Sequence, residues 1–255
     1  MGSKEPIVSM FGLDYCACTL ERAAKLIIDA ALLKKKGLVV TPNVDHVVSM
    51  QRDNEMFELY RLAMFRFADG MPLVWFSRLF RGKGLPERVC GSDLLPAIAK
   101  LAAMNGSKLF LLGGLPGVAE QASARLIQQN PSLHVAGTYS PPFGFEQDEL
   151  ESRRIVRMIN ESGAEILFVG VGSPKQEKWA AKYMESLDVG PILGVGAAFD
   201  FAAGTVRRAP VWIQKIGMEW LWRLIQEPGR LWRRYILKDS RFIFMVVKEL
   251  LQGAK

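Results

Sequence analysis

A single carboxylate ends an apolar run in the segment RFADGMPLVW, residues 66–75. The run Met64–Ala68 stops at Asp69-Gly70, and a second apolar run begins after Pro72. A carboxylate at the end of a buried strand can act as a general base that takes a proton from a substrate hydroxyl, and Gly70 would leave room for the substrate beside it. The same side chain could instead cap a helix that begins near Pro72. The local pattern therefore leaves a catalytic base and a helix cap both open.

Segments with strand and helix character alternate around this residue. This alternation is typical of a mostly parallel sheet with helices on both faces, so we predict an α/β fold. The predicted strands are Ile7–Leu13, Leu38–Thr41, Met64–Ala68, Lys108–Gly113, His134–Thr138, Glu165–Gly170 and Pro191–Val195. The predicted helices between them are Leu20–Lys36, Ser92–Met104, Val118–Gln129, Gln147–Ser162 and Gln176–Leu187.

Small, polar or acidic residues follow five of these strands. Ligands of parallel sheets bind beyond the carboxyl ends of the strands, so these residues are candidates for a binding site. Glycine and asparagine also make ordinary turns, which is the alternative for each of them taken alone. The segments concerned are Thr41–Asn43, Asp69-Gly70, Gly113-Gly114, Gly170–Gln176 and Gly194–Asp200.

The glycine pairs restrict which nucleotide chemistry is plausible. Gly113 and Gly114 join a predicted strand to a helix start, where backbone N–H groups and the helix dipole can favour a phosphate. No Gly-Lys-Ser/Thr follows, so this is not a Walker A loop. A nicotinamide-dependent oxidoreductase remains a weakly supported alternative, because the third glycine of the dinucleotide fingerprint is missing from both Gly170/Gly172 and Gly194/Gly196.

The bulk composition is that of a globular protein, with 49% apolar and 23% charged residues among 255. No run reaches the ~18 uncharged apolar residues of a spanning helix. Residues 1–15 contain charges and no long apolar region, so we expect no signal peptide and a cytoplasmic protein. Three cysteines, including Cys16 and Cys18, form neither a disulfide framework nor a usual zinc spacing.

The positive charge is concentrated in residues 205–255. This segment holds 11 Lys/Arg and 4 Asp/Glu, a net of 11 − 4 = +7, which equals the net charge of the whole chain. Four of the six tryptophans lie in the same segment. We therefore predict a neutral domain over residues 1–204 and a basic, helical C-terminal appendage over residues 205–255.

The appendage has the amphipathic pattern of a helix in a membrane interface. A helix over residues 229–251, at about 100° per residue, has an apolar side and a cationic side, and a preceding helix over 212–226 carries a tryptophan-containing stripe. Packing against the sheet is the alternative, and a nucleic-acid site lacks any accompanying motif. The predicted apolar side comprises Leu231, Trp232, Tyr235, Ile236, Phe242, Ile243, Val246, Val247 and Leu250.

Several sequence blocks, in their order and spacing, resemble the WecG/TagA/CpsF family of bacterial glycosyltransferases. They run from about residue 8 to about residue 240 and read TPNVDHV, FADGMPLVW, ERVCGSDLLP, LFLLGGLPG, VGVGSPKQEKW, GVGAAFDFAAG and RRAPVWIQKIGMEWLWRLIQEPGRLWRRY. The resemblance implies a Rossmann-like fold and an inverting transfer of N-acetylmannosamine or a related sugar. It implies a UDP-sugar donor and a polyprenyl-diphosphate-linked sugar acceptor, in cell-surface polysaccharide or teichoic acid synthesis.

The resemblance also assigns candidate roles to residues. It places the catalytic base at Asp69 and puts Arg88 near a phosphate or the sugar. Thr41 and Asn43 offer uncharged partners for sugar hydroxyls, and Gln176 stands at a predicted helix start beside the donor or acceptor sugar. The predicted UDP site comprises Gly113, Gly114, Gly172, Gly196 and Asp200. Three arginines of the appendage would approach the pyrophosphate: Arg223, Arg230 and Arg233.

No Asp-x-Asp pair occurs, although many sugar-nucleotide transferases use one to hold Mn²⁺ or Mg²⁺. We therefore expect no metal site and no cofactor, with arginines and helix N-termini balancing the diphosphate. The prediction is a hexosyltransferase (EC 2.4.1-type) that is peripheral on the inner face of the cytoplasmic membrane and binds no nucleic acid. An oxidoreductase and a basic membrane-binding adaptor are the alternatives. The sequence leaves the oligomeric state open, a homo-oligomer included.

Overall fold

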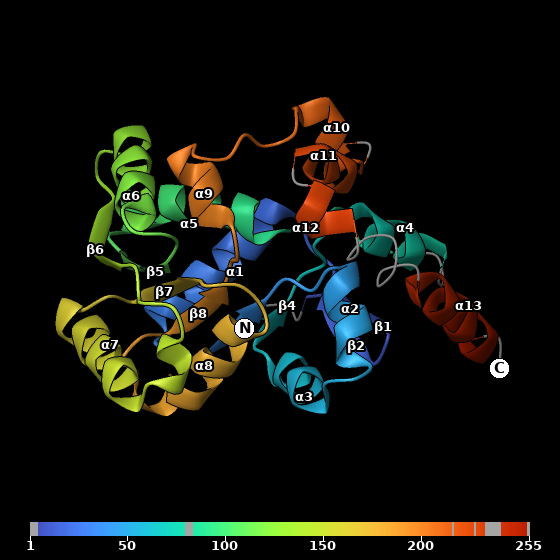
Figure 1. Cartoon of the computed structure of the whole chain (residues 1–255), viewed down its shortest axis with the longest axis horizontal. Helices are drawn as coiled ribbons and strands as arrows, with labels where there is room; N and C mark the ends of the chain where they lie inside the picture. The colour runs from blue at the N-terminus through green and yellow to red at the C-terminus, as the bar shows by residue number, and fades with distance from the viewer. Residues whose placement is uncertain (1–4, 80–83, 216, 227, 233–240, 254–255) are drawn as a thin grey trace.

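The computed structural model describes residues 5–79, 84–215, 217–226, 228–232 and 241–253 (Figure 1). Within these residues, six parallel strands form one sheet in the order β4-β3-β8-β7-β5-β6. The central strands are continuous apolar runs, as expected for a sheet that is buried on both faces. Their bounds are β3 Gly37–Val40, β4 Phe65–Arg66, β5 Lys108–Gly113, β6 His134–Tyr139, β7 Ile166–Gly170 and β8 Pro191–Gly194.

Helices cover both faces of this sheet, so the predicted α/β architecture is confirmed. One apolar core lies under α1 Leu20–Leu32, α5 Gly91–Asn105, α6 Val118–Gln129 and α9 Ala198–Ala203. The second core lies under α2 Val44–Met50, α3 Asn54–Leu62, α4 Met71–Leu79, α7 Glu149–Ser162 and α8 Lys175–Tyr183, with the short 3₁₀ helices η1 Phe145–Gln147 and η2 Met184–Ser186.

The first predicted strand, Ile7–Leu13, is confirmed only over Ile7–Met10, because the chain turns back at Phe11 and Gly12. It forms an antiparallel hairpin of β1 Ile7–Met10 and β2 Leu13–Cys16. The turn residues Phe11 and Gly12 have φ of 54° and 75°. Two successive residues with positive φ are typical of the tight turns that match the twist of a hairpin.

The C-terminal segment folds into four helices within its described residues: α10 Val211–Lys215, α11 Glu219–Gln226, α12 Pro228–Trp232 and α13 Arg241–Gly253. The single helix predicted over 212–226 is wrong, because the chain turns at Gly217, where φ is 73°. That glycine packs against α4, since an added Cβ would lie 2.6 Å from the Met71 Cβ and 2.8 Å from the Trp75 ring. The middle of the predicted 229–251 helix, residues 233–240, lies outside the described residues. Throughout the described part of the chain, helices are too short or too polar to cross a bilayer.

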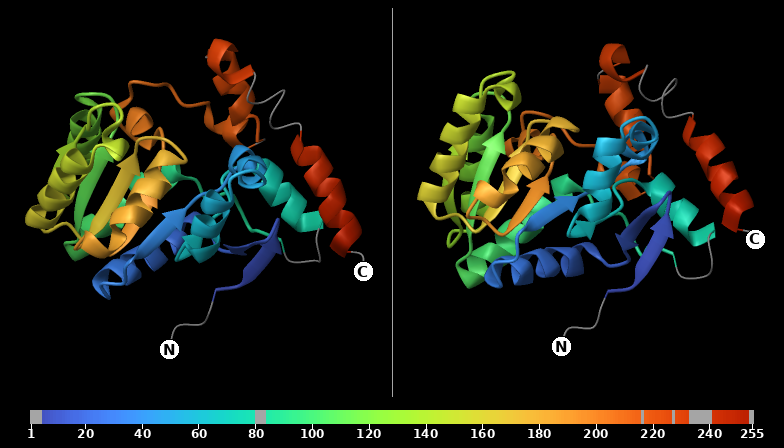
Figure 2. Two further views of the ribbon diagram at one scale, coloured as in Figure 1. Left: turned by 60° about the horizontal axis from the view of Figure 1, so that its bottom comes forward. Right: turned by 90° about the horizontal axis from the view of Figure 1, so that it is seen from below.

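Helix α13 packs on the hairpin and on α4, at one end of the molecule (Figure 2). Phe242 is buried, and its ring lies 5.2 Å from the Phe11 ring and 6.4 Å from the Phe76 ring, between centroids. The Phe11 N–H also donates a hydrogen bond to Glu249 Oε1, at 3.0 Å. Phe242 and the partly buried Val246 therefore face residues 1–204, which we call the body. The apolar side predicted for this helix is thus divided between residues that pack on the body and residues that stay exposed. The apolar residues that remain exposed are Ile243, Phe244, Val247, Leu250 and Leu251.

Candidate active site

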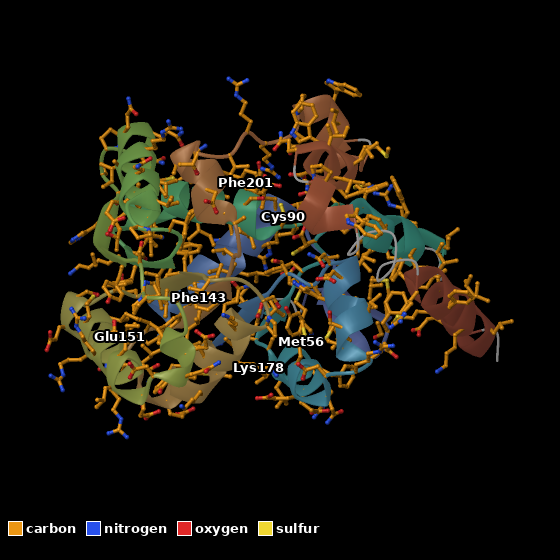
Figure 3. All side chains as sticks on the ribbon, viewed as in Figure 1. Met56, Cys90, Phe143, Glu151, Lys178 and Phe201 are labelled. Atoms are coloured by element: carbon orange, nitrogen blue, oxygen red, sulfur yellow. The ribbon has the colours of Figure 1, made fainter. Side chains whose placement is uncertain are left out.

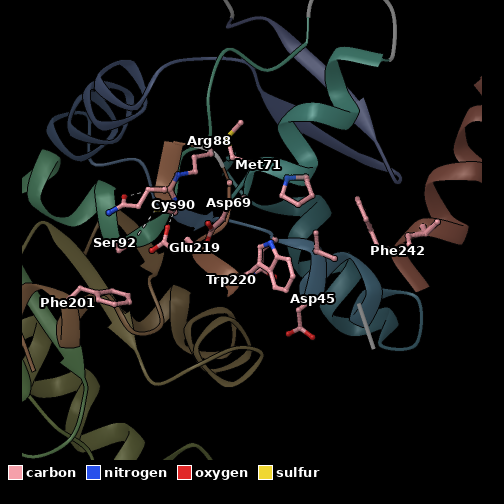
Figure 4. A pocket seen from close by; sticks show the side chains of 17 residues that line it. Asp45, Asp69, Met71, Arg88, Cys90, Ser92, Phe201, Glu219, Trp220 and Phe242 are labelled. Carbon is pink, nitrogen blue, oxygen red and sulfur yellow. Dashed lines mark hydrogen bonds and ion pairs between the residues drawn. The ribbon is translucent and has the colours of Figure 1, made fainter. Parts of the chain in front are cut away.

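A cavity of about 520 Å³ lies at the carboxyl end of β3 and β4 (Figure 4). The body and the C-terminal helices both contribute to its wall. Its described lining residues are Asn43, Val44, Asp45, Asp69, Gly70, Met71, Pro72, Arg88, Cys90, Ser92, Phe201, Gln214, Gly217, Glu219, Trp220, Phe242 and Ile243.

The topology of the sheet explains why a cavity forms here. The chain leaving β3 enters α2 and α3 over one face, whereas the chain leaving β4 passes α4 and reaches α5 over the opposite face. Ligand sites of parallel sheets form where successive connections diverge in this way. The segments that begin at Asn43 and at Asp69 are the two that diverge, and both line the cavity.

Asp69 is held at the cavity by the backbone around it. Its N–H donates to the Pro42 carbonyl at 2.9 Å, and the carbonyl of Ala68 accepts from the N–H of Val89 at 2.8 Å. Gly70 adopts a φ of 121°, which strains any residue with a Cβ. The glycine is therefore required by the backbone that turns the chain from β4 into α4. The carboxylate lies close enough to Cys90 and Arg88 for its charge to affect the pKa of both groups.

Four charged side chains at the rim, Arg88, Asp93, Arg208 and Glu219, form a network that we call the charge clasp. Arg88 contacts Glu219 (Nη1–Oε2, 2.6 Å) and Asp93 (Nη2–Oδ2, 3.3 Å). Arg208 forms two hydrogen bonds to Asp93, one of them at 3.0 Å to Oδ2, and one to Glu219 at 3.1 Å. Arg88 thus lines the cavity, with its charge balanced by carboxylates.

Cys90 lines the cavity and also contacts the clasp, because its thiol donates a hydrogen bond to Asp93 Oδ2 at 3.0 Å (Figure 4). Burial raises the pKa of the Cys90 thiol, and the charges of Asp69 and Asp93 add to that effect, so the thiol is neutral at pH 7. Burial also acts to raise the pKa of Asp93, but hydrogen bonds from Arg208 and Cys90 and the charges of both arginines outweigh it. The pKa of Asp93 is therefore lower than usual.

Residues 8–255 match the model of the Glycosyl transferase WecG/TagA/CpsF family. The chain belongs to this family. It is accordingly a glycosyltransferase of cell-surface polysaccharide synthesis. The fold of this WecG/TagA/CpsF member therefore has to bring a sugar donor and an acceptor together, and the cavity beside Asp69 has charged residues at one part of its wall and apolar residues at another.

Of the other three residues predicted to contact the sugar in this glycosyltransferase, one lines the cavity and two are buried and are not among its described lining residues. Asn43 lines the cavity, and its Oδ1 accepts from the His46 N–H at 3.1 Å, so it also caps α2. Thr41 is buried just after β3 and is not among the described lining residues. Gln176 is buried as well: its Oε1 accepts from the Gly196 N–H at 3.1 Å, and its Nε2 donates to Glu177 Oε1 at 2.9 Å. Its side chain supports the loop after β8.

The predicted nucleotide loops lie at the carboxyl edge of the sheet, as Asp69 does. None of their predicted UDP-binding residues is among the described residues that line the cavity. Gly113 is tightly packed, since an added Cβ would lie 2.5 Å from the Gly170 carbonyl oxygen. Gly172 and Gly196 have φ of 88° and 52°, with open space where a Cβ would be. The carbonyl of Asp200 accepts from Thr205 N–H, which ends α9. Packing thus accounts for the first glycine pair, whereas the other two glycines border open space.

The side chains of Arg223 and Arg230, and the whole of Arg233, lie outside the described residues. Their helices α11 and α12 are described, and α11 contributes Trp220 to the cavity. Among the described residues, no cluster of His, Cys, Asp and Glu could hold a metal ion.

Sequence reasoning missed several lining residues that come from distant parts of the chain. Cys90, which stands on the body side, and Phe201, which stands on α9 (Figure 3), both line the cavity. Asp45 and Cys90 lie within the blocks TPNVDHV and ERVCGSDLLP, so those blocks could have indicated them. Glu219 also lies within a block, RRAPVWIQKIGMEWLWRLIQEPGRLWRRY, whereas Phe242 lies outside every block and reaches the cavity only through the folding of the appendage.

Proposed function

We propose that the protein is an inverting UDP-sugar glycosyltransferase with Asp69 as its general base. The Asp69 carboxylate takes the proton of an acceptor hydroxyl as the oxygen forms a bond to the anomeric carbon of the donor. The bond between that carbon and UDP breaks, and its electron pair leaves with the diphosphate. Inversion follows because the hydroxyl attacks from the face opposite the leaving group.

The observation that carries this proposal is the position of Asp69 on the cavity wall, in the short segment that joins β4 to α4. Three carboxylates line the described cavity: Asp45, Asp69 and Glu219. Both carboxylate oxygens of Glu219 are engaged in ion pairs, one with Arg88 and one with Arg208, so neither is left for a substrate hydroxyl. Asp69 is supported over Asp45 because, although both lie in blocks that carry the family resemblance, the resemblance implies a catalytic base only at Asp69.

We assign the donor as a UDP-sugar of the N-acetylmannosamine type or a related hexose or uronic acid. Gly172 and Gly196 support a diphosphate near the carboxyl ends of β7 and β8, because a Cβ added at either residue would meet nothing within 4 Å. Thr41, Asn43 and Gln176 remain proposed contacts of the sugar, with Gln176 acting through the Gly196 loop. Gly113, Gly114 and Asp200 would support the same nucleotide from neighbouring loops.

We assign the acceptor as a polyprenyl-diphosphate-linked sugar that the enzyme meets at the inner face of the cytoplasmic membrane. Apolar residues from three helices, Met71, Trp220 and Phe242, give the cavity a surface suited to the isoprenoid beside the diphosphate. The appendage also exposes Trp212, Trp232, Ile243 and Phe244 and carries a net charge of +7. Exposed tryptophans and cations favour the interface of an anionic bilayer.

The appendage arginines belong to the same proposal, with Arg223, Arg230 and Arg233 stabilising the leaving diphosphate. Replacing all three by glutamine should abolish transfer while leaving the urea midpoint of unfolding unchanged. The matched control replaces Arg153, Arg154 and Arg157 of α7, which lie away from the cavity. Full activity of the first triple variant would exclude a role for these arginines.

The central experiment replaces Asp69 by Asn and measures UDP release from a panel of UDP-sugars, with a short-chain lipid-diphosphate-GlcNAc as acceptor. Loss of a general base should lower kcat by about 10²–10⁴-fold. Asp29→Asn, a change in an exposed carboxylate of α1, is the control and should keep full activity. Loss of activity in Asp45→Asn but not in Asp69→Asn would move the base to Asp45. UDP, and not NAD(P)H, should raise the melting temperature of the wild-type protein.

A further inference from the structure

The charge clasp is the main polar connection between residues 205–255 and the body within the described structure. Arg88 and Asp93 belong to the body, whereas Arg208 and Glu219 belong to the C-terminal segment. All four side chains are largely shielded, with exposed fractions between 15% and 24%. Two arginines and two carboxylates balance one another, so the clasp carries no net charge.

Helix geometry favours this arrangement. Asp93 lies in the first turn of α5, and Glu219 is the first residue of α11. Carboxylates are stabilised at the N-terminal end of a helix. Arg88 comes from the non-helical segment before α5, and Arg208 from the one before α10, and each arginine contacts both carboxylates. Arg208 also lies over the ring of Phe201, 6.0 Å from its centroid, which limits the freedom of its side chain.

The clasp lies beside the cavity without filling it. Arg88 and Glu219 line the cavity, whereas Asp93 and Arg208 are not among its described lining residues. The segment fixed by Arg208 and Glu219 supplies Gln214, Gly217 and Trp220 to the wall. Gln214 strengthens the connection, because its Oε1 accepts from Arg88 at 3.0 Å and its Nε2 donates to the Ala209 carbonyl at 2.7 Å.

We propose that Asp93 and Arg208 are positioning residues that hold the α10–α11 wall over Asp69 and fix the guanidinium of Arg88 at the cavity. They act through Arg88 and Glu219, without touching the substrates. This inference deepens the proposed transferase and rests on it for its kinetic part, while its structural part stands independently. A wall displaced by about 1 Å can cost about 10²-fold in rate, since transfer depends on the alignment of the reacting groups.

The structural part is tested by the rate at which iodoacetamide alkylates Cys90, followed by peptide mass spectrometry. We expect Arg208→Gln and Asp93→Asn each to raise this rate at least tenfold, because an open clasp exposes the thiol. Charge effects alone would act in opposite directions, since removing a cation disfavours the thiolate and removing an anion favours it. Faster alkylation in both variants therefore reports opening. Arg207→Gln, which changes an exposed neighbouring arginine, should leave the rate unchanged.

The positioning role is tested by a double-mutant cycle on kcat/KM. Each single variant should lose about 10²-fold, the double variant should be no worse than the poorer single one, and Arg208→Lys should recover part of the loss. Unchanged Cys90 alkylation in both single variants would overturn the clasp. Faster alkylation with unchanged kcat/KM, or with faster amide exchange throughout β5 and β7, would overturn the positioning role. If wild-type enzyme turned over no UDP-sugar, the proposed function would fail while the alkylation result still decided the clasp.

Discussion

Arg66 allows a sharp test of how the structure holds the strand that leads to Asp69. Its Nη1 group lies 3.1, 2.8 and 2.7 Å from the carbonyls of Tyr60, Arg61 and Ala63, and its Nε donates to the Asp14 carbonyl at 2.6 Å. One guanidinium thus binds the C-terminal end of α3, where a cation is also favoured by the helix dipole, and ties β4 to the hairpin. Arg66→Met keeps much of the apolar stem and removes every donor.

The magnitude follows from which of these bonds water can replace. The contacts with Asp14 and Arg61 are exposed, whereas those with Tyr60 and Ala63 are partly buried. Hydrogen bonds to a charged group contribute about 1.5–3 kcal/mol each, but Nη1 has two protons for three carbonyls, so we expect a loss of about 2–4 kcal/mol in the free energy of unfolding. For a chain of this size, that loss should lower Tm by roughly 5–15 °C.

The assay is urea unfolding followed by far-UV circular dichroism, with comparison of the midpoint at constant m. Arg61→Met is the matched control, because Arg61 is 53% exposed and forms an i,i+3 pair with Glu58. Exposed pairs of this kind contribute roughly 0.2–1 kcal/mol, so the control should shift the midpoint little. Equal shifts in the two variants would refute the view that Arg66 anchors β4.

Two further predictions concern the appendage and its clasp. Phe242→Ala should release α13, because Phe242 is only 8% exposed, and amide exchange in residues 241–253 should quicken while β5 stays protected; Phe244→Ala, at 76% exposed, should change nothing. Equal rates of amide exchange in the Phe242→Ala and Phe244→Ala variants would contradict the packing of α13 on the hairpin and α4. The pKa of Asp93 is lowered by folding, so its carboxylate contributes stability above an unfolded pKa of about 3.9, and this contribution is lost as pH falls through the lower folded value. Asp93→Asn should therefore flatten the dependence of unfolding free energy on pH in that acid window, and an unchanged slope would contradict the assignment.

Much of the fold could be predicted because each central strand has a continuous apolar sequence. LFLLG in β5 and ILFVG in β7 are flanked by glycine and by helical spacing, so both strands and their helices were predicted close to their observed bounds. The hairpin was not predicted, because its turn places the bulky Phe11 in a left-handed conformation that such residues rarely adopt. The helix predicted over 212–226 failed for a related reason, since the turn at Gly217 depends on packing against Met71 and Trp75.

The candidate site could be predicted only where it follows the strands. Asp69 and Asn43 share a cavity because parallel strands end at one edge of the sheet, which is a property of the topology. The contact between Arg88 and Glu219 joins residues 131 positions apart, and no local pattern encodes the way the C-terminal helices fold back. Gln176 was expected beside the sugar, yet the close approach of Gly194 lets its amide pack beneath the Gly196 loop.

The neutrality of the clasp has a consequence for the electrostatics of the whole appendage. The clasp takes one cation and one anion from residues 205–255, so the remaining balance is (11 − 1) − (4 − 1) = +7, unchanged from the total. Attachment to the body therefore uses none of the excess positive charge. Added salt screens the exposed cations far more strongly than the shielded clasp. Ionic strength should thus weaken the proposed attraction of this segment to an anionic surface without detaching it from residues 1–204.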